Sequence, residues 1–252
     1  MKHCLNPSDT EGTNLEVAME HKSGCLHCGK ELLYLDRPEE LSCIYCKGTF
    51  STQARCVDNH FVCDACHSLS ANDLIERFTN ASVSKDPLEM AITLMKSPSV
   101  KMHGPEHHFL VPAVLLSAFY NTSGRPEEKE ARIKKARQRA EHVLGGFCGF
   151  YGTCGAAVGT GIFVSVITDA TPYSHGEWRQ CNLMTAQSLQ SIAEAGGPRC
   201  CKRDSFLAIQ EALRFTGEQF RVEMETGPAM LKCEFHHLNK ECKKGECRFY
   251  PS

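Results

Sequence analysis

The sequence lacks the features that would place a protein in a membrane or on a polyanion. Its 252 residues carry 28 Lys and Arg against 30 Asp and Glu, a formal net charge of −2. A dedicated binder of nucleic acid or of anionic membranes usually has a strong basic excess. No uninterrupted apolar run approaches the ~18–20 residues of a membrane span. We therefore expect no membrane association, and nucleic-acid binding is open through local basic segments but not favoured.

A secretion signal and internal repeats are also missing. The first residues, MKHCLNPSDTEG, have no apolar core of the kind that signal peptides contain. We expect a cytoplasmic protein, long enough to bury a real core as one large domain or two modest ones.

Cysteine is absent from residues 67–147, although the chain has 16 cysteines. Eight lie at or before Cys66, and eight more lie from Cys148 to Cys247. Cysteines used as small hydrophobic residues would be scattered. Grouped cysteines in a reducing compartment indicate metal ligation or redox chemistry rather than disulfides.

The first group contains two Cys-x-x-Cys pairs, CLHC (25–28) and CIYC (43–46), separated by 14 residues. Each pair can hold a metal with two thiolates from a tight turn, and two pairs supply a tetrahedral set. A module of fewer than about 50 residues needs such a metal to fold, so we expect structural zinc. A rubredoxin-like iron site is the main competing assignment. The metal ligands expected here are Cys25, Cys28, Cys43 and Cys46.

A second group follows in CVDNHFVCDACH (56–67). The pair Cys63–Cys66 could hold a second zinc together with Cys56 and either His60 or His67. Alternatively, residues 25–66 form one interleaved two-metal unit, and spacing alone does not decide the pairing. Short strand-like pieces at 31–35, 41–45 and 60–63 suggest a zinc-ribbon or treble-clef-like α+β module.

The remaining organisation is mainly helical. We expect a polar lead-in over 1–24, the cysteine-rich module over 25–70, a mainly helical domain over 71–228 and a cysteine-rich and histidine-rich tail over 229–252. Apolar spacing of three to four residues predicts helices. These cover 73–80, 86–97, 105–121, 125–144, 176–194 and 198–216, with a short strand at 218–224. Small residues favour a tightly packed helix over a strand at 155–168.

The segment MHGPEHH (102–108) gathers His103, Glu106, His107 and His108 just before an apolar helix. His103 and His107 are four residues apart and would share a face if the helix began early enough. Glu106 would suit a general base or a ligand. The segment predicts a mononuclear metal site or acid–base machinery, with an exposed polar helix start as the alternative.

The glycine-rich stretch GGFCGFYGTCGAAVG (145–159) carries Cys148 and Cys154. Thr153 can cap the following helix and place Cys154 in its first turn, where the helix dipole lowers a thiol pKa. The alternative is close packing of helices at glycines, with the cysteines as small core residues.

In AGGPRCCKRDSF (195–206), Pro198 would start a helix with Cys200 and Cys201 in its first turn. The neighbouring cations are Arg199, Lys202 and Arg203. These thiols should ionise easily, and the cations would favour a small anionic or sulfur-containing substrate. Cys181 is an additional ligand or a core thiol.

The tail CEFHHLNKECKKGEC could close a third metal site, or could form a simple lysine-rich surface. Its candidate ligands are Cys233, Cys242 and Cys247, accompanied by His236 and His237.

Several of these motifs resemble known families. GTCGAAVG (152–159) is similar to the core of a redox-associated family named after its Cys-Gly-Cys-Ala-x-x-Gly-Cys-Cys pattern, although Thr153 stands where that family has a cysteine. CVDNHFVCDACH, MHGPEHH, CGFYGTCGA and GGPRCCKRD look like an uncharacterised cysteine-rich family of anaerobic archaea and bacteria. This resemblance covers most of residues 43–247 and brings no established activity. It implies a redox or radical-SAM partner enzyme, because relatives occur beside or fused to radical-SAM enzymes.

A weaker likeness to iron–sulfur dehydratases and cysteine desulfidases implies a 4Fe–4S cluster with one open iron. Our main hypothesis is an iron–sulfur or thiol-dependent enzyme of sulfur transfer, desulfuration or electron transfer, with structural zinc. The cluster ligands, or a dithiol relay, would come from Cys148, Cys154, Cys200 and Cys201. The catalytic candidates are His103, Glu106, His107, Cys154 and Cys200.

The second hypothesis is a zinc-dependent interaction or RNA-binding module without catalysis. In it, Cys25–Cys66 and the basic run KEARIKKARQR (129–139) would form the contact face. Such a charge run is also typical of a solvated helix face.

Overall fold

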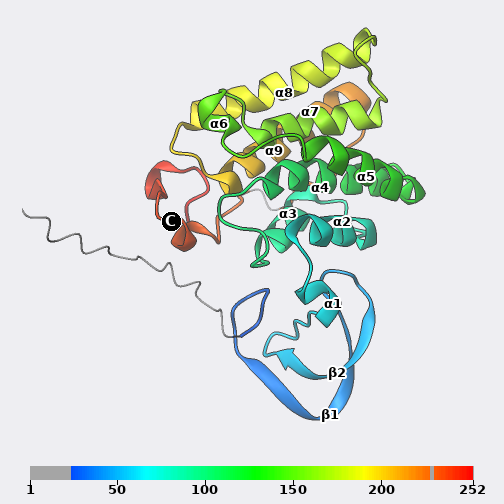
Figure 1. The fold of residues 1–252 in the computed structure, drawn as a ribbon, viewed down its shortest axis with the longest axis vertical. Coiled ribbons are helices and arrows are strands. Elements are labelled where there is room, and N and C mark those ends of the chain that lie inside the picture. Colours follow the sequence, from blue (N-terminus) through cyan, green and yellow to red (C-terminus); the bar gives the residue numbers. More distant parts are fainter. Residues whose placement is uncertain (1–23, 228–229, 252) are drawn as a thin grey trace, which may run out of the picture.

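The computed structural model describes residues 24–227 and 230–251, so the expected lead-in lies almost wholly outside the described residues. Helices predominate, and a two-stranded module lies at one side of the helical domain (Figure 1). The C-terminal segment lies at the end of that domain where α8 ends and α9 begins (Figure 1). In the described part of the chain, no helix is both long and apolar enough to cross a membrane.

The module contains one antiparallel hairpin and a single helical turn. Strand β1 (Leu32–Ser42) pairs with β2 (Thr49–Cys56) in a register that sets Leu32 opposite Cys56. Helix α1 (Asp64–His67) follows. The strand pieces expected at 31–35 and 41–45 are parts of one strand, and the piece expected at 60–63 is not a strand. Sequence reasoning missed β2, whose TFSTQARC has little apolar alternation.

The helical domain follows the expected periodicity closely. Its longer helices are α2 (Ala71–Ala81), α3 (Pro87–Met95), α4 (Glu106–Thr122), α5 (Lys129–Ala140), α7 (Gly155–Ile167), α8 (Gly176–Ala195) and α9 (Cys201–Phe220). Shorter pieces are α6 (Phe147–Phe150) and the 3-10 turns Pro126–Glu128, His236–Leu238 and Lys244–Glu246. Local chemistry fixes two of the starts. The Ser70 hydroxyl accepts the amide of Asp73, and Asp86 caps α3 with Pro87 at its first position.

The core is built around α4 and the glycine-rich α7. Helix α4 is apolar on all sides and largely buried, as expected for a helix enclosed by others. A Cβ added at Gly155 would lie 2.1 Å from the His108 ring, and one added at Gly159 would lie 2.9 Å from Pro112 Cδ. The glycines of 145–159 that enter α7 therefore serve close helix packing, which was the alternative interpretation of this stretch.

Three local expectations are wrong. Thr153 does not cap α7, because its hydroxyl donates to the Tyr151 carbonyl and Cys154 itself is the N-cap residue. Helix α9 begins at Cys201 rather than at 198, with Cys200 as its N-cap residue. The strand expected at 218–224 is absent from the described structure, since α9 continues to Phe220 and no strand partner lies beside the residues that follow.

The module packs against the helical domain through its second cysteine pair. Tyr45 is 1% exposed, and its ring meets Phe78 of α2 edge-on at 6.3 Å. Nearby, Lys96 after α3 forms an ion pair with Glu234 at 3.0 Å. Burial lowers the pKa of His27 to about 4, and the charges of His60 and Lys96 add to that effect. The first cysteine pair therefore lies close to the end of α3 and to the C-terminal segment.

Candidate metal centres

The first N-terminal centre is formed by Cys25, Cys28, Cys56 and His60. One ligand atom from each of these residues lies within 4.8 Å of all the others. The Sγ atoms of Cys28 and Cys56 are 3.4 Å apart, and His60 Nδ1 is 3.3 Å from Cys28 Sγ. This group could hold one metal ion such as zinc.

The second centre is formed by Cys43, Cys46, Cys63 and Cys66, whose sulfur atoms also lie within 4.8 Å of one another. The Sγ atoms of Cys46 and Cys63 are 3.8 Å apart. Tetrahedral zinc with bonds of about 2.3 Å to sulfur places its thiolates about 3.8 Å apart. The geometry therefore fits one metal ion, such as zinc, held by four thiolates.

The pairing of these ligands is interleaved. CLHC joins Cys56 and His60, while CIYC joins Cys63 and Cys66. The grouping of CLHC with CIYC on one metal is therefore wrong, and the interleaved alternative holds, with His60 rather than His67 as the nitrogen ligand. The cause is the hairpin, because β2 returns along β1 and brings Cys56 back beside the first pair.

Backbone amides support these sulfurs in a repeated way. The amide two residues further along the chain donates to the thiol at Cys28, Cys43 and Cys56. Burial alone would raise the pKa of Cys43, but the amides of Cys46, Cys63 and Tyr45 outweigh it and lower that pKa to about 7. Amides directed at sulfur stabilise the thiolate that a metal requires.

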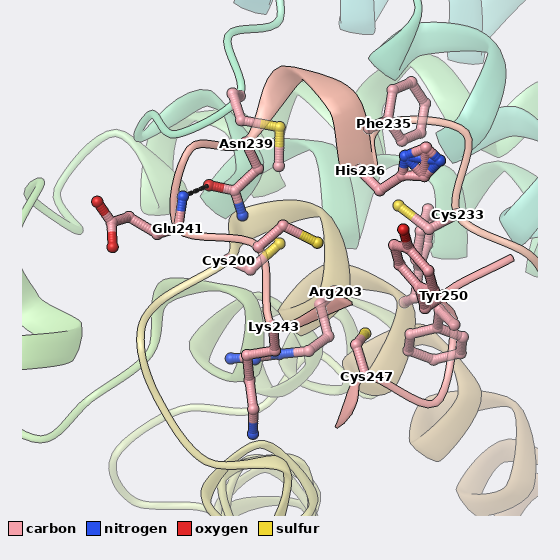
Figure 2. Close-up of a pocket in the computed structure, with 14 residues that line it drawn as sticks. Cys200, Arg203, Cys233, Phe235, His236, Asn239, Glu241, Lys243, Cys247 and Tyr250 are labelled. Carbon is pink, nitrogen blue, oxygen red and sulfur yellow. Dashed lines mark hydrogen bonds between the residues drawn. The ribbon is translucent and has the colours of Figure 1, made fainter. Parts of the chain in front are cut away.

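A further set of candidate ligands, consisting of four cysteines, lines one pocket at the other end of the sequence. Cys200 comes from the start of α9, and the rest come from the C-terminal segment: Cys233, Cys242 and Cys247. Figure 2 shows the sulfurs of Cys200, Cys233 and Cys247 directed toward the same space. The cavity between the lining residues has a volume of about 20 Å³, and the space above it opens to solvent.

The walls of this pocket are largely apolar. They include Met102 and three phenylalanines, Phe206, Phe235 and Phe249, of which Phe206 and Phe249 stack edge-on at 5.6 Å. Polar side chains also line it, among them Asn239, Lys243 and Tyr250 (Figure 2). The pocket therefore offers four soft ligands inside a shell of low polarity.

The amide pattern of the N-terminal centres recurs here. The amide of Phe235 donates to Cys233, and the amide of Lys244 donates to Cys242 at 3.4 Å. Lys244 has a φ of 52°, comparable with the 60° of Lys47, which follows the second pair of the module. Burial raises the pKa of Cys233 to about 11, and the nearby thiols of Cys200, Cys247 and Cys242 contribute to the rise. A bound cation would remove this mutual repulsion.

The C-terminal set differs from the other two in spacing. Over residues 24–227 and 230–251, only the two N-terminal groups bring three or more ligand atoms within 4.8 Å of one another. The four pocket cysteines therefore line one pocket without the close grouping of sulfurs that a single tetrahedral zinc requires.

The thiols expected to ionise easily do not. Burial raises the pKa of Cys154 to about 12 and that of Cys201 to about 11, and the charge of Asp204 adds to both. Burial also raises the pKa of Cys200.

Two of the cations expected to lower these pKa values interact with other groups. Lys202 Nζ donates to the Val100 carbonyl at 3.1 Å, and Arg203 pairs with Asp204 at 3.0 Å.

The expected convergence of four cysteines on one site is only partly seen. Cys200 lines the pocket, whereas Cys201 faces the amide of Gly104 and lies close enough to Cys154 for their charges to interact. Cys148 lies in α6, outside the pocket. Cys181 lies beside the hydroxyls of Ser165 and Thr168 near α7 and is likewise outside it.

Of the residues singled out in MHGPEHH, His103 contacts a residue that lines the pocket. Helix α4 begins at Glu106, so His103 precedes the helix and does not share a face with His107. His103 Nε2 lies 3.2 Å from Oδ1 of Asn239, which lines the pocket. The Glu106 carboxylate accepts the amide of Lys101 at 2.8 Å. Burial lowers the pKa of His107 well below its usual value, so this ring is a neutral core group.

The sequence did not predict that Cys200 lines one pocket with the tail cysteines. It also did not predict the contact of Asn239 with His103 or the pairing of Asp204 with Arg203. One signal was available for Cys242, because Cys-Lys-Lys-Gly at 242–245 resembles Cys-Lys-Gly at 46–48. The link from Cys200 to Cys233 had no local signal.

No curated protein and no solved structure matches the chain. The profile of a family of unknown function, DUF5714, matches residues 75–250. The matched region begins after both N-terminal centres and contains all four pocket cysteines. The chain therefore belongs to DUF5714, with a metal-binding cysteine module placed before the family region.

Proposed function

We propose that this protein is an iron–sulfur protein of redox chemistry, with two structural zinc ions in the N-terminal module. Cys200, Cys233, Cys242 and Cys247 would hold the cluster, of the 4Fe–4S type. The observation that carries the proposal is the convergence of four cysteines, three of them supported by backbone amides, on one apolar pocket where they are not gathered as closely as the ligands of a single ion.

The chemistry of the donors supports this assignment. Four thiolates suit zinc and iron–sulfur clusters alike, so donor type alone does not separate them. Spacing does, because the two N-terminal sets already have the separations of a mononuclear site and the pocket set does not. The apolar wall and the amides directed at sulfur are the features by which proteins adjust cluster potentials.

Among the three reactions considered, electron transfer has the most support. Four protein thiolates would occupy every iron of a 4Fe–4S cluster and leave no open position for a substrate. A dithiol relay of Cys154 and Cys201 is disfavoured, because pKa values of about 12 and about 11 leave almost no thiolate near neutral pH. Sulfur transfer and desulfuration, which need a reactive thiolate or an open iron, rank lower.

The alternative RNA-binding function is weakened because several cations of its expected contact face are paired with carboxylates. On α5, Arg132 and Lys135 pair with Asp169, and Arg137 pairs with Asp73, Glu76 and Glu141. Three of the six cations in the basic run are therefore paired with carboxylates within the protein.

The test is metal and sulfide analysis of protein purified without oxygen, together with its visible absorption. We expect two zinc ions, iron with labile sulfide and a brown colour. Cys181→Ser, which removes a thiol outside the pocket, should leave all three unchanged. Colourless protein that contains only zinc would refute the cluster.

A further inference from the structure

We propose that the C-terminal segment around the pocket is the docking surface for a small acidic one-electron carrier protein. The inference rests on the proposed cluster and adds the partner that supplies its electrons. The surface, called here the basic rim, consists of Arg199, Lys240, Lys243, Lys244 and Arg248.

The rim cations stand directly beside the residues that form the pocket. Lys243 lines the pocket itself, and Lys240 lies between Asn239 and Glu241, which also line it. Arg248 follows the proposed ligand Cys247, and Arg199 precedes Cys200. A protein bound to these side chains would therefore bring its own redox centre close to the cluster.

The rim charges are not neutralised within the described structure. Arg199, Lys240, Lys244 and Arg248 are exposed and form no ion pair among the described residues, and Lys243 donates only to the Ala195 carbonyl. Two carboxylates, Glu241 and Glu246, accompany these five cations, while Glu234 is occupied by Lys96. The rim is thus a net positive patch on a chain whose formal charge is −2.

Helix α5 provides the contrast that makes this patch informative. It has a higher density of cations, yet Arg132, Lys135 and Arg137 are held by carboxylates of neighbouring elements. Charges held in this way contribute little to the field that steers a partner, whereas unpaired ones do. Steering to the cluster would therefore come from the rim rather than from the more basic sequence.

The rim also has the apolar element that interfaces use. Leu238 is 42% exposed and lies next to the pocket residue Asn239, and His236 stacks on Tyr250 at 5.1 Å between ring centres. An apolar centre surrounded by charge is the usual anatomy of a protein interface. Weak, transient complexes of electron carriers need only such a small contact.

A carrier protein with a single flavin can reduce the cluster by one electron in a balanced reaction. A flavodoxin in its anionic hydroquinone form gives one electron to the oxidised cluster and becomes the neutral semiquinone. The cluster gains that electron, and no bond is made or broken.

The test follows this reaction in a stopped-flow instrument, using the full chain with its cluster and an acidic flavodoxin hydroquinone. We expect the second-order rate constant to fall as ionic strength rises. The variant Lys240→Glu/Arg248→Glu should react about ten times more slowly at low salt and should approach wild type at high salt. The matched control is Lys134→Glu/Arg179→Glu, which makes the same change in net charge at exposed positions on α5 and α8 and should react like wild type.

Three results would overturn the proposal. They are an unchanged rate in the rim variant, an equal loss in the control, and binding of an RNA oligonucleotide but not of flavodoxin by the rim. Iron and sulfide content and reduction by dithionite are measured on every variant.

Absence of a cluster in wild type would refute the proposed function itself. If dithionite reduces the cluster but the rate of reduction by flavodoxin does not depend on the rim charges, only the docking surface is refuted.

Discussion

The two cysteine-rich ends of this chain share one kind of backbone hydrogen bond but differ in how closely their cysteines are grouped. In both, the amide two residues beyond a cysteine donates to its sulfur, as at Cys56 and Cys242. In the N-terminal module the ligands are drawn together until one ion fits. At the C-terminal pocket they are less closely grouped and lie among aromatic rings. Each set thus has four candidate ligands, and their spacing and surroundings distinguish the sets.

The two regions also differ in what would remain without metal. The module has two strands and one helical turn, and most of β1 is exposed. Its buried groups are chiefly the ligands themselves and Tyr45. The pocket, in contrast, is lined in part by residues of α9, whose inner face is buried in the helical core. Metal loss should therefore unfold the first region, whereas loss of the proposed cluster should leave the second region folded.

The largest expected effect is on the module. Cys63→Ala removes a buried ligand of the second centre, and we expect zinc to fall from two ions to one or none, with loss of protection from proteolysis over residues 24–67. Small zinc modules derive most of their folding free energy from the metal. The helical circular-dichroism signal should persist. Retention of two zinc ions with an intact module would contradict the interleaved site.

A large but more local effect is expected at the pocket. Cys242→Ser should remove the iron and sulfide while both zinc ions stay, because no N-terminal ligand is altered. Elemental analysis and visible absorption measure both quantities in one sample. Cys148→Ser serves as the control, since Cys148 lies outside the pocket, and should keep the full metal content. Loss of iron in both variants would point to a different ligand set.

An intermediate effect is expected in thiol reactivity. The pKa of Cys154 is raised to about 12, so the reactive thiolate forms only as the pH rises toward that value. At pH 9, alkylation of Cys154 by iodoacetamide should be on the order of 500-fold slower than in the unfolded chain. Mass spectrometry of labelled peptides gives the rates. Equal rates in folded and unfolded protein would mean that burial does not govern this thiol.

The smallest expected effect concerns packing within the helical domain. In Gly159→Ala the new methyl would lie 2.9 Å from Pro112 Cδ and 3.1 Å from the His108 carbonyl oxygen. Moving these helices apart should cost about 1–3 kcal/mol of unfolding free energy. Gly149→Ala, with nothing within 4 Å of the added atom, is the matched control. Thermal denaturation compares the two, and equal stabilities would contradict the close α4–α7 contact.

Local patterns in the sequence carried much of the architecture. Helical periodicity predicted the helical domain, and two Cys-x-x-Cys pairs predicted metal binding, because both depend on neighbours a few residues apart. The interleaved pairing was one of the alternatives that spacing left open, and the choice could not be made because it follows from the register that sets Leu32 opposite Cys56. The pocket could not be predicted either, because in it Cys200 meets cysteines more than 30 residues away.

Thiol ionisation was wrongly predicted for a related reason. The helix start and the cations at 199–203 suggested low pKa values for Cys200 and Cys201. Burial dominates instead, and Lys202 and Arg203 are committed to a backbone carbonyl and to Asp204. Desolvation depends on tertiary packing, which no short sequence window contains.

The most direct test of the two-region account is anomalous diffraction from one crystal at the zinc and iron absorption edges. The account predicts two zinc peaks, one within Cys25, Cys28, Cys56 and His60 and the other within Cys43, Cys46, Cys63 and Cys66. It also predicts an iron peak among Cys200, Cys233, Cys242 and Cys247. A zinc peak with no iron in the pocket, or iron within the module, would contradict it.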